Sequence, residues 1–145
     1  SMKVILGKPG RKNSANTVII HDFDIWNIDY TLATIIHPLL LRYRENMQGF
    51  PELFEEGMVT YHNWDRQLHF DFIDEKVEHD YLLKKWETIV DKMCRAFGMI
   101  VEKEKWEDTW TSLSYHEYRI EAEKFYQTVD EGLALFAKHY HALWD

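Results

Sequence analysis

The chain has 145 residues, of which 46% are hydrophobic and 15% aromatic, a composition that excludes a disordered chain and suits one domain with a buried core. Its 25 acidic and 17 basic residues give a net charge of −8, which disfavours non-specific binding to nucleic acid and to anionic membranes. The single cysteine, Cys94, excludes an intrachain disulfide, and no apolar run approaches the ~20 residues of a membrane span.

Two short β-prone segments open the chain. The first is Lys3–Leu6, which the sequence Gly-Lys-Pro-Gly then interrupts, and the second is Thr17–His21, which contains four β-branched residues. Together they predict a small β-hairpin. A two-stranded hairpin is marginal by itself, so we expect it to lie against the helices.

A long helix is predicted after Asp22, with Asp24 or Asn27 as its cap and an end near residues 47–49. Its apolar residues follow the three-four spacing of one helix face, which predicts the core-facing set Ile28, Leu32, Ile35, Ile36, Leu39 and Tyr43. Pro38 inside it predicts a kink, because proline removes a backbone hydrogen bond. The run also holds three polar residues that need partners or a ligand when buried, namely Asp29, Thr31 and His37.

The segment Glu52–Asp74 is less regular. Two stretches within it, 58–62 and 67–72, suit a second hairpin, and an ordered loop remains the alternative. A second helix follows from Asp74 or Glu75 to Glu102, with the apolar positions Val77, Tyr81, Trp86, Ile89, Val90, Met93, Phe97 and Ile100.

Lys103–Ser112 is charged and rich in tryptophan, and we predict a connecting loop there. A third helix is predicted over Ser114–Leu143, with the packing set Tyr118, Phe125, Val129, Leu133, Phe136, Tyr140 and Leu143. Gly132 within it costs roughly 1 kcal/mol relative to alanine, which indicates close approach of a neighbouring helix. The fold class is therefore α+β, mainly α: one domain over residues 1–145, with three long helices in a bundle and one or two small β-hairpins.

Motifs for catalysis are weak. The chain has no Gly-rich phosphate loop, zinc pattern or nucleophile elbow, and we predict no cofactor. Two His-Asp dipeptides resemble metal ligands, which leaves a metal site as an alternative with the ligands His21, Asp22, His79 and Asp80. Glu87 and Asp91 lie four residues apart on one helix face, but the second acidic pair of helical nucleotide pyrophosphatases is missing.

The aromatic residues are more suggestive. Aromatic rings beside cations can stack on a base and hold its phosphates, whereas the alternative is that the same rings fill a core or a subunit interface. The aromatic residues concerned are Trp26, Tyr30, Trp86, Trp106, Trp110 and Trp144, and the available cations are Arg42, Arg44, Lys84, Lys85 and Arg95.

Three blocks of sequence, in the same order, resemble a family of small, uncharacterised proteins of tailed bacteriophages. They are Asp22-x-Asp24-x-Trp26-x-x-Asp29-x-Thr31-Leu32-Ala33, then Trp86-x4-Asp91-x-Met93-x2-Ala96-Phe97, and the C-terminal Leu135-Phe136-x-Lys138-x-Tyr140-x2-Leu143-Trp144-Asp145. They cover roughly half of the chain, and Glu52–Asp74 departs from the family. The resemblance implies a phage origin and transfers no activity. It raises two interpretations of Asp29: a pair with Lys138, or a pocket floored by Trp26 and Trp144.

From the resemblance and the absence of enzyme motifs, we expect a counter-defence protein in the cytoplasm of the infected bacterium. It would bind and sequester a nucleotide signal of bacterial immunity, of the cyclic dinucleotide or cyclic ADP-ribose type, without cleaving it. We expect a homo-oligomer and predict the ligand-binding residues Trp26, Asp29, Tyr30, Arg42, Arg95, Lys138 and Trp144. The alternatives are a protein-binding inhibitor of a host enzyme, with an acidic or aromatic surface, and a metal-dependent nucleotide hydrolase.

Overall fold

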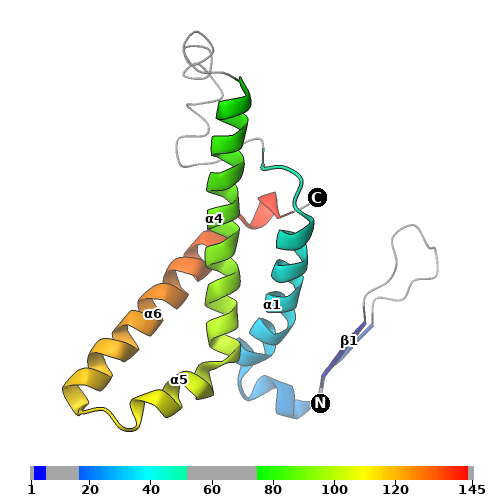
Figure 1. Cartoon of the computed structure of the whole chain (residues 1–145). Coiled ribbons are helices and arrows are strands. Elements are labelled where there is room, and N and C mark those ends of the chain that lie inside the picture. Colours follow the sequence, from blue (N-terminus) through cyan, green and yellow to red (C-terminus); the bar gives the residue numbers. More distant parts are fainter. Residues whose placement is uncertain (1, 6–16, 52–74, 144–145) are drawn as a thin grey trace.

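A computed structural model describes residues 2–5, 17–51 and 75–143, and it is mainly helical (Figure 1). The elements in chain order are β1 (Lys3–Ile5), β2 (Thr17–Ile19), the 3-10 turn η1 (Asp22–Ile25), α1 (Ile28–Asn46), α4 (Glu75–Val101), α5 (Lys103–Trp110), α6 (Tyr115–Lys138) and the 3-10 turn η3 (Tyr140–Ala142). The mainly α class, the three long helices and the first hairpin are confirmed. The predicted second hairpin falls in 52–74, outside the described residues.

Helix α4 is the central element, with α1 on one side of it and α6 on the other (Figure 1). Its apolar stripe is buried as predicted at Trp86, Ile89, Val90, Met93 and Phe97, whereas Tyr81 is 60% exposed. One cluster joins this stripe to α1, and a second cluster, Met99, Trp110, Phe125 and Val129, joins the end of α4 to α5 and α6. The core is therefore built around α4.

The predicted inner face of α1 is wrong at three positions, since Ile28, Leu32 and Leu39 are 54%, 49% and 52% exposed. Ile36 and Tyr43 pack against the core as predicted, and the residues that α1 buries fully are Ala33 and Leu40. The physical reason is that α1 carries apolar side chains on more than one face, so that periodicity alone does not choose the face that meets α4.

The segment predicted as a connecting loop contains a fourth helix, α5, which is a second correction. Its ion pair between Lys103 and Glu107, four residues apart, supports the helix, and Trp110 is only 7% exposed because it packs in the second cluster. The lysine and glutamate residues of the segment favour a helix, and burial of Trp110 stabilises it in this position. The third helix is also shorter than predicted, since α6 ends at Lys138 and η3 follows.

Close helix packing at Gly132 is confirmed. A Cβ atom added there would lie 2.6 Å from the carbonyl oxygen of Lys92 and would also overlap the side chain of Ala96. Glycine is thus required for α6 to approach α4 at this point, which offsets its cost within a helix.

The hairpin pairs β1 and β2 antiparallel, with Val4 opposite Val18. It stands beside α1 and does not lie against the helices as expected (Figure 1). The buried carboxylate of Asp24 fixes its base, because it accepts hydrogen bonds from the backbone N–H groups of Met2 at 3.1 Å and His21 at 2.8 Å. Within the described residues, no helix is long and apolar enough to cross a membrane.

Candidate functional site

An open cavity of about 460 Å³ lies between α5 and α6. Its lining residues are Lys103, Glu107, Trp110 and Thr111 from α5 and Tyr118 and Tyr126 from α6. The α5 residues share one helix face, and so do the two tyrosines, which are eight residues apart. We refer to this cavity as the α5–α6 cleft. Its volume falls within the range of small-molecule sites.

The local sequence explains how the cleft is held open. The backbone of Glu102 leaves the helical conformation between α4 and α5, so that α5 turns away from the axis of α4 (Figure 1). Ser114 caps α6: its hydroxyl accepts a hydrogen bond from the N–H of Glu117 at 3.2 Å and donates one to the carboxylate of the same residue at 2.9 Å. This serine cap fixes the start of α6 opposite α5.

Trp110 forms the apolar wall of the cleft. Its ring packs edge-to-face on Tyr118 at 5.9 Å and on Phe125 at 5.5 Å, measured between centroids. Tyr118 and Tyr126 remain 41% and 46% exposed, so both rings are open to a ligand. Aromatic walls of this kind bind planar, partly apolar molecules by stacking.

Lys103 provides the positive charge of the cleft. Its Nζ atom lies 5.7 Å from the centroid of the Tyr126 ring and 3.8 Å from the carboxylate of Glu107. The hydrogen bond to Tyr126 raises the pKa of the Lys103 ammonium group, and the negative charges of Glu107 and Asp29 raise it further. Lys103 is therefore fully protonated at neutral pH and available to hold an anionic group.

Asp29 is the predicted site residue that this geometry connects to the cleft. Its charge acts on Lys103, at the start of α5. Lys138 lies at the other end of the α6 packing surface, beyond Gly132 and next to η3. The charge of Asp29 thus acts on Lys103 at the start of α5, whereas Lys138, the predicted partner of Asp29, is the last residue of α6.

The other predicted ligand-binding residues are dispersed. Trp26 is 74% exposed and stacks on Phe23 with centroids 5.0 Å apart, at the entry to α1. Tyr30 is 50% exposed on α1, while Arg42 and Arg95 are exposed on α1 and α4. Trp144 lies outside the described residues. Trp26, Tyr30, Arg42 and Arg95 are therefore not among the residues that line the α5–α6 cleft.

The polar residues of the first helix find structural roles. The Thr31 hydroxyl donates to the carbonyl oxygen of Asp24 at 2.8 Å, which ties η1 to α1. The imidazole of His37 packs where Gly98 leaves room on α4, since a Cβ atom added at Gly98 would lie 2.8 Å from its Nε2 atom. Neither residue needs a ligand to account for its position.

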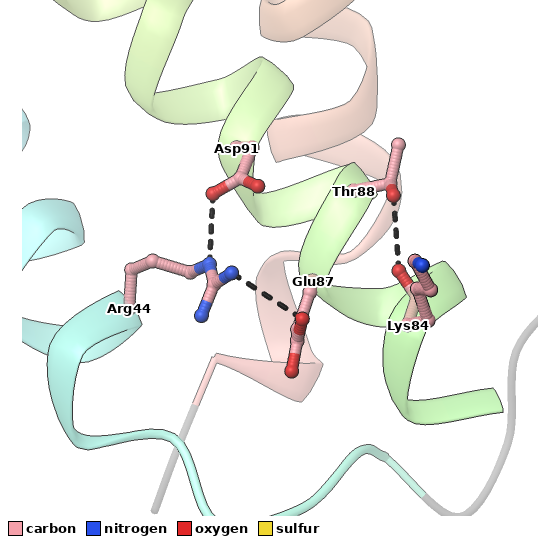
Figure 2. A network of polar contacts seen from close by, with 5 residues as sticks. All are labelled: Arg44, Lys84, Glu87, Thr88 and Asp91. Carbon is pink, nitrogen blue, oxygen red and sulfur yellow. Dashed lines mark hydrogen bonds and ion pairs between the residues drawn. The ribbon is translucent and has the colours of Figure 1, made fainter. Parts of the chain in front are cut away.

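A separate polar network joins α1 to α4 (Figure 2). The Arg44 guanidinium donates to Asp91 at 2.7 Å and to Glu87 at 3.3 Å, and the hydrogen bond to Asp91 raises the pKa of Arg44. Arg44 was a candidate cation for phosphate, and here both acidic residues engage it. The pair Glu87 and Asp91 therefore serves as an interhelical clamp.

The metal alternative receives no geometric support. Within the described residues, no three His, Cys, Asp or Glu side chains are grouped so that they could hold a metal ion. His21 and Asp22 lie at η1, whereas His79 and Asp80 lie near the start of α4, at the opposite end of the helices (Figure 1).

Sequence reasoning missed the cleft because it treated Lys103–Ser112 as a loop and assigned Tyr118 to the core. The available signal was the four-three spacing of Lys103, Glu107 and Trp110, which places all three on one helix face.

No protein-family model, curated protein or solved structure matches this chain.

Proposed function

We propose that the protein binds a nucleotide signal of bacterial immunity in the α5–α6 cleft and sequesters it without cleaving it. The observation that carries the proposal is a protonated lysine that lies over the ring of Tyr126 in an open cavity of about 460 Å³, which the exposed ring of Tyr118 also lines. In this arrangement Tyr118 and Tyr126 offer stacking surfaces for a base, and Lys103 contacts a phosphate.

Binding without cleavage fits the chemistry of the cleft. A raised pKa keeps Lys103 protonated, so its amine is a poor base or nucleophile at neutral pH. Glu107 forms an ion pair with that ammonium group at 3.8 Å. Such a pair can hold and orient a ligand, while proton transfer needs groups with pKa values near neutrality.

The biological part of the proposal rests on the resemblance to tailed-phage proteins. A phage protein that captures an immune nucleotide lowers its free concentration and needs no turnover. The ligand class is therefore a cyclic dinucleotide or a cyclic ADP-ribose derivative, in which bases and phosphates alternate. The alternative of a protein-binding inhibitor would use an acidic surface to which Glu78 was expected to contribute. Glu78 is only 3% exposed, so it does not belong to such a surface.

A thermal-shift panel of cyclic dinucleotides and cyclic ADP-ribose derivatives tests the proposal. We expect one class to raise the melting temperature, and we expect chromatography after denaturation to recover it intact. Tyr126→Ala should weaken its binding about 10- to 100-fold, since stacking contributes roughly 1–3 kcal/mol for each base. Lys103→Ala should weaken binding and reduce its dependence on salt.

Tyr115→Ala is the matched control. Tyr115 is 75% exposed on the same helix, outside the lining of the cleft, so its removal should leave binding unchanged. If Tyr115→Ala and Tyr126→Ala lose affinity equally, or if Tyr126→Ala binds as tightly as the wild-type protein, the ligand binds outside the α5–α6 cleft. Recovery of a cleaved product would show a hydrolase instead, and copurification of a host protein with no nucleotide shift would favour the inhibitor alternative.

A further inference from the structure

Helix α1 carries an apolar stripe beside the face that packs on α4. Ile28, Leu32 and Leu39 are 54%, 49% and 52% exposed, and the partly buried Ile35 lies between them in the same stripe. We call these four residues the α1 seam. Exposed apolar side chains are common singly, but a continuous stripe of this kind marks a contact surface.

The spacing of the seam is that of a coiled coil. Its residues are separated by four, three and four positions, and Arg42 and Asn46 continue the pattern towards the end of α1. This is the a/d repeat with which one helix inserts its side chains between those of another. Ala33 and Leu40, which meet the core, lie on a different face, so that α1 can pack on α4 and on a second helix together.

We propose that the α1 seam is a homodimer interface, in which α1 of one copy packs antiparallel on α1 of a second copy. The four-three-four spacing is the same in both directions, so a two-fold axis near Thr34 places each seam residue opposite a seam residue. Ile28 of one copy then lies against Leu39 of the other, and Leu32 lies against Ile35. A self-complementary surface is what a two-fold interface requires.

Charge supports a second copy as the occupant. In this register, Arg42 of one copy comes level with the η1 end of the other copy, where Asp22 and the Trp26 ring are exposed. Arginine forms favourable contacts with both a carboxylate and an indole ring. A lipid surface fits less well, because the net charge of −8 opposes binding to anionic membranes.

The area also fits a dimer. Phe23, Ile25 and Trp26 precede α1 and are 66%, 58% and 74% exposed, and they extend the seam at its start. Residues of this size present on the order of 200 Å² when fully exposed, so the seven residues together offer roughly 700 Å². That is close to the ~800 Å² which each partner contributes to a standard interface.

The hairpin segment exposes further apolar side chains next to α1. It stands on the side of α1 that faces away from α4 (Figure 1), and its Val18 and Ile20 are 53% and 64% exposed. A second copy along α1 would meet this hairpin as well. This contact would stabilise a two-stranded element that is marginal alone.

Sedimentation analysis of the full chain, from micromolar to millimolar concentration, tests the interface. We expect twice the chain mass of 17.5 kDa for the wild-type protein. Leu32→Glu combined with Leu39→Glu should raise the dissociation constant by about 100-fold or more, because the interface would then bury four carboxylates against the apolar side chains of Ile28 and Ile35. Both positions are already half exposed, so circular dichroism should show an unchanged helix content.

The matched control adds the same charge elsewhere. Tyr115→Glu combined with Ile120→Glu changes two exposed residues of α6 and should leave the dimer intact. A wild-type protein that stays monomeric throughout, or a seam variant that remains as dimeric as the control, overturns the proposal. A monomer that floats with neutral lipid vesicles overturns it in favour of a membrane surface.

Cross-linking decides the orientation of the helices. In the antiparallel register, Ile28→Cys combined with Leu39→Cys should give a covalent dimer with a short bis-maleimide. Either single variant should give little, because Ile28 in the two copies would lie roughly 16 Å apart along the helix axis. Efficient cross-linking of the Ile28→Cys single variant would show a parallel pair and would overturn the antiparallel arrangement.

Discussion

Cys94 lies in the core between α1 and α4, close to the Arg44 clamp. Only 7% of the residue is exposed, and burial raises the pKa of its thiol to about 11, with the Asp91 charge acting in the same direction. The neighbouring guanidinium of Arg44 lowers the pKa but does not offset burial. The thiol is thus held in its neutral form, which makes it inert as a nucleophile at neutral pH.

This pKa predicts a loss of stability at alkaline pH. The folded state keeps the Cys94 proton up to about pH 11, whereas the unfolded thiol, with an ordinary pKa of 9.0, loses its proton earlier. The contribution is therefore complete below pH 9 and decreases as the pH rises through the folded-state pKa. We expect a decrease of roughly 2 kcal/mol in the free energy of unfolding between pH 8 and pH 10.5.

Urea denaturation at the two pH values, with a reducing agent present, measures this change. Cys94→Ala is the control, because other groups also titrate in this range and the variant retains them. The wild-type protein should lose more stability than Cys94→Ala over the same interval. If the two proteins lose equal amounts, the thiol is not the group responsible.

At the scale of the elements, the contact between α4 and α6 depends on one glycine. Lys92 and Ala96 of α4 occupy the space beside Gly132 in which any larger residue would place its Cβ atom. Alongside this contact, Lys92 donates to Glu131 at 2.7 Å. The pair is about half exposed, so it contributes little, and close backbone packing is the main determinant of the contact.

Gly132→Ala should therefore destabilise the protein by about 1–3 kcal/mol, although alanine favours helix formation by up to ~1 kcal/mol. Thermal unfolding should show a melting temperature lower by several degrees. Gly49→Ala is a suitable control, because nothing lies within 4 Å of the position of its added Cβ atom. A Gly132→Ala variant as stable as Gly49→Ala would mean that α6 can move away from α4 without cost.

At the scale of the whole molecule, the two proposed surfaces belong to different helices. The α5–α6 cleft is lined from α5 and α6, whereas the α1 seam belongs to α1, which lies on the other side of α4 from α6 (Figure 1). Association through the seam would leave the cleft open. Ligand binding and dimer formation can therefore be disrupted separately.

A dimer makes the melting temperature depend on protein concentration. We expect a rise of about 2–4 °C for each tenfold increase in concentration, because mass action stabilises the associated folded state. The Leu32→Glu/Leu39→Glu protein should show a constant melting temperature over the same range. Differential scanning calorimetry makes the comparison, and a wild-type melting temperature that does not change with concentration would argue against the dimer.

The amino-acid sequence by itself determined the local structure. The three-four spacing of α4 identified its buried face, because only one face of that helix is apolar. The position of Gly132 inside a predicted helix indicated close packing, and the β-prone, β-branched residues of Lys3–Leu6 and Thr17–His21 predicted β1 and β2. Each of these inferences depends on one element and its immediate neighbours in the chain.

Only the tertiary structure decided what depends on contacts between elements. Helix α1 has two apolar faces. Leu40 is buried and Leu39 is half exposed, because α4 packs against the face that carries Leu40. Helix α5 forms because Trp110 finds a buried position against Phe125, and Lys103 meets Tyr126 only because α5 and α6 converge. The physical reason is that periodicity records which faces of an element are apolar, whereas packing decides which of those faces are covered and by what.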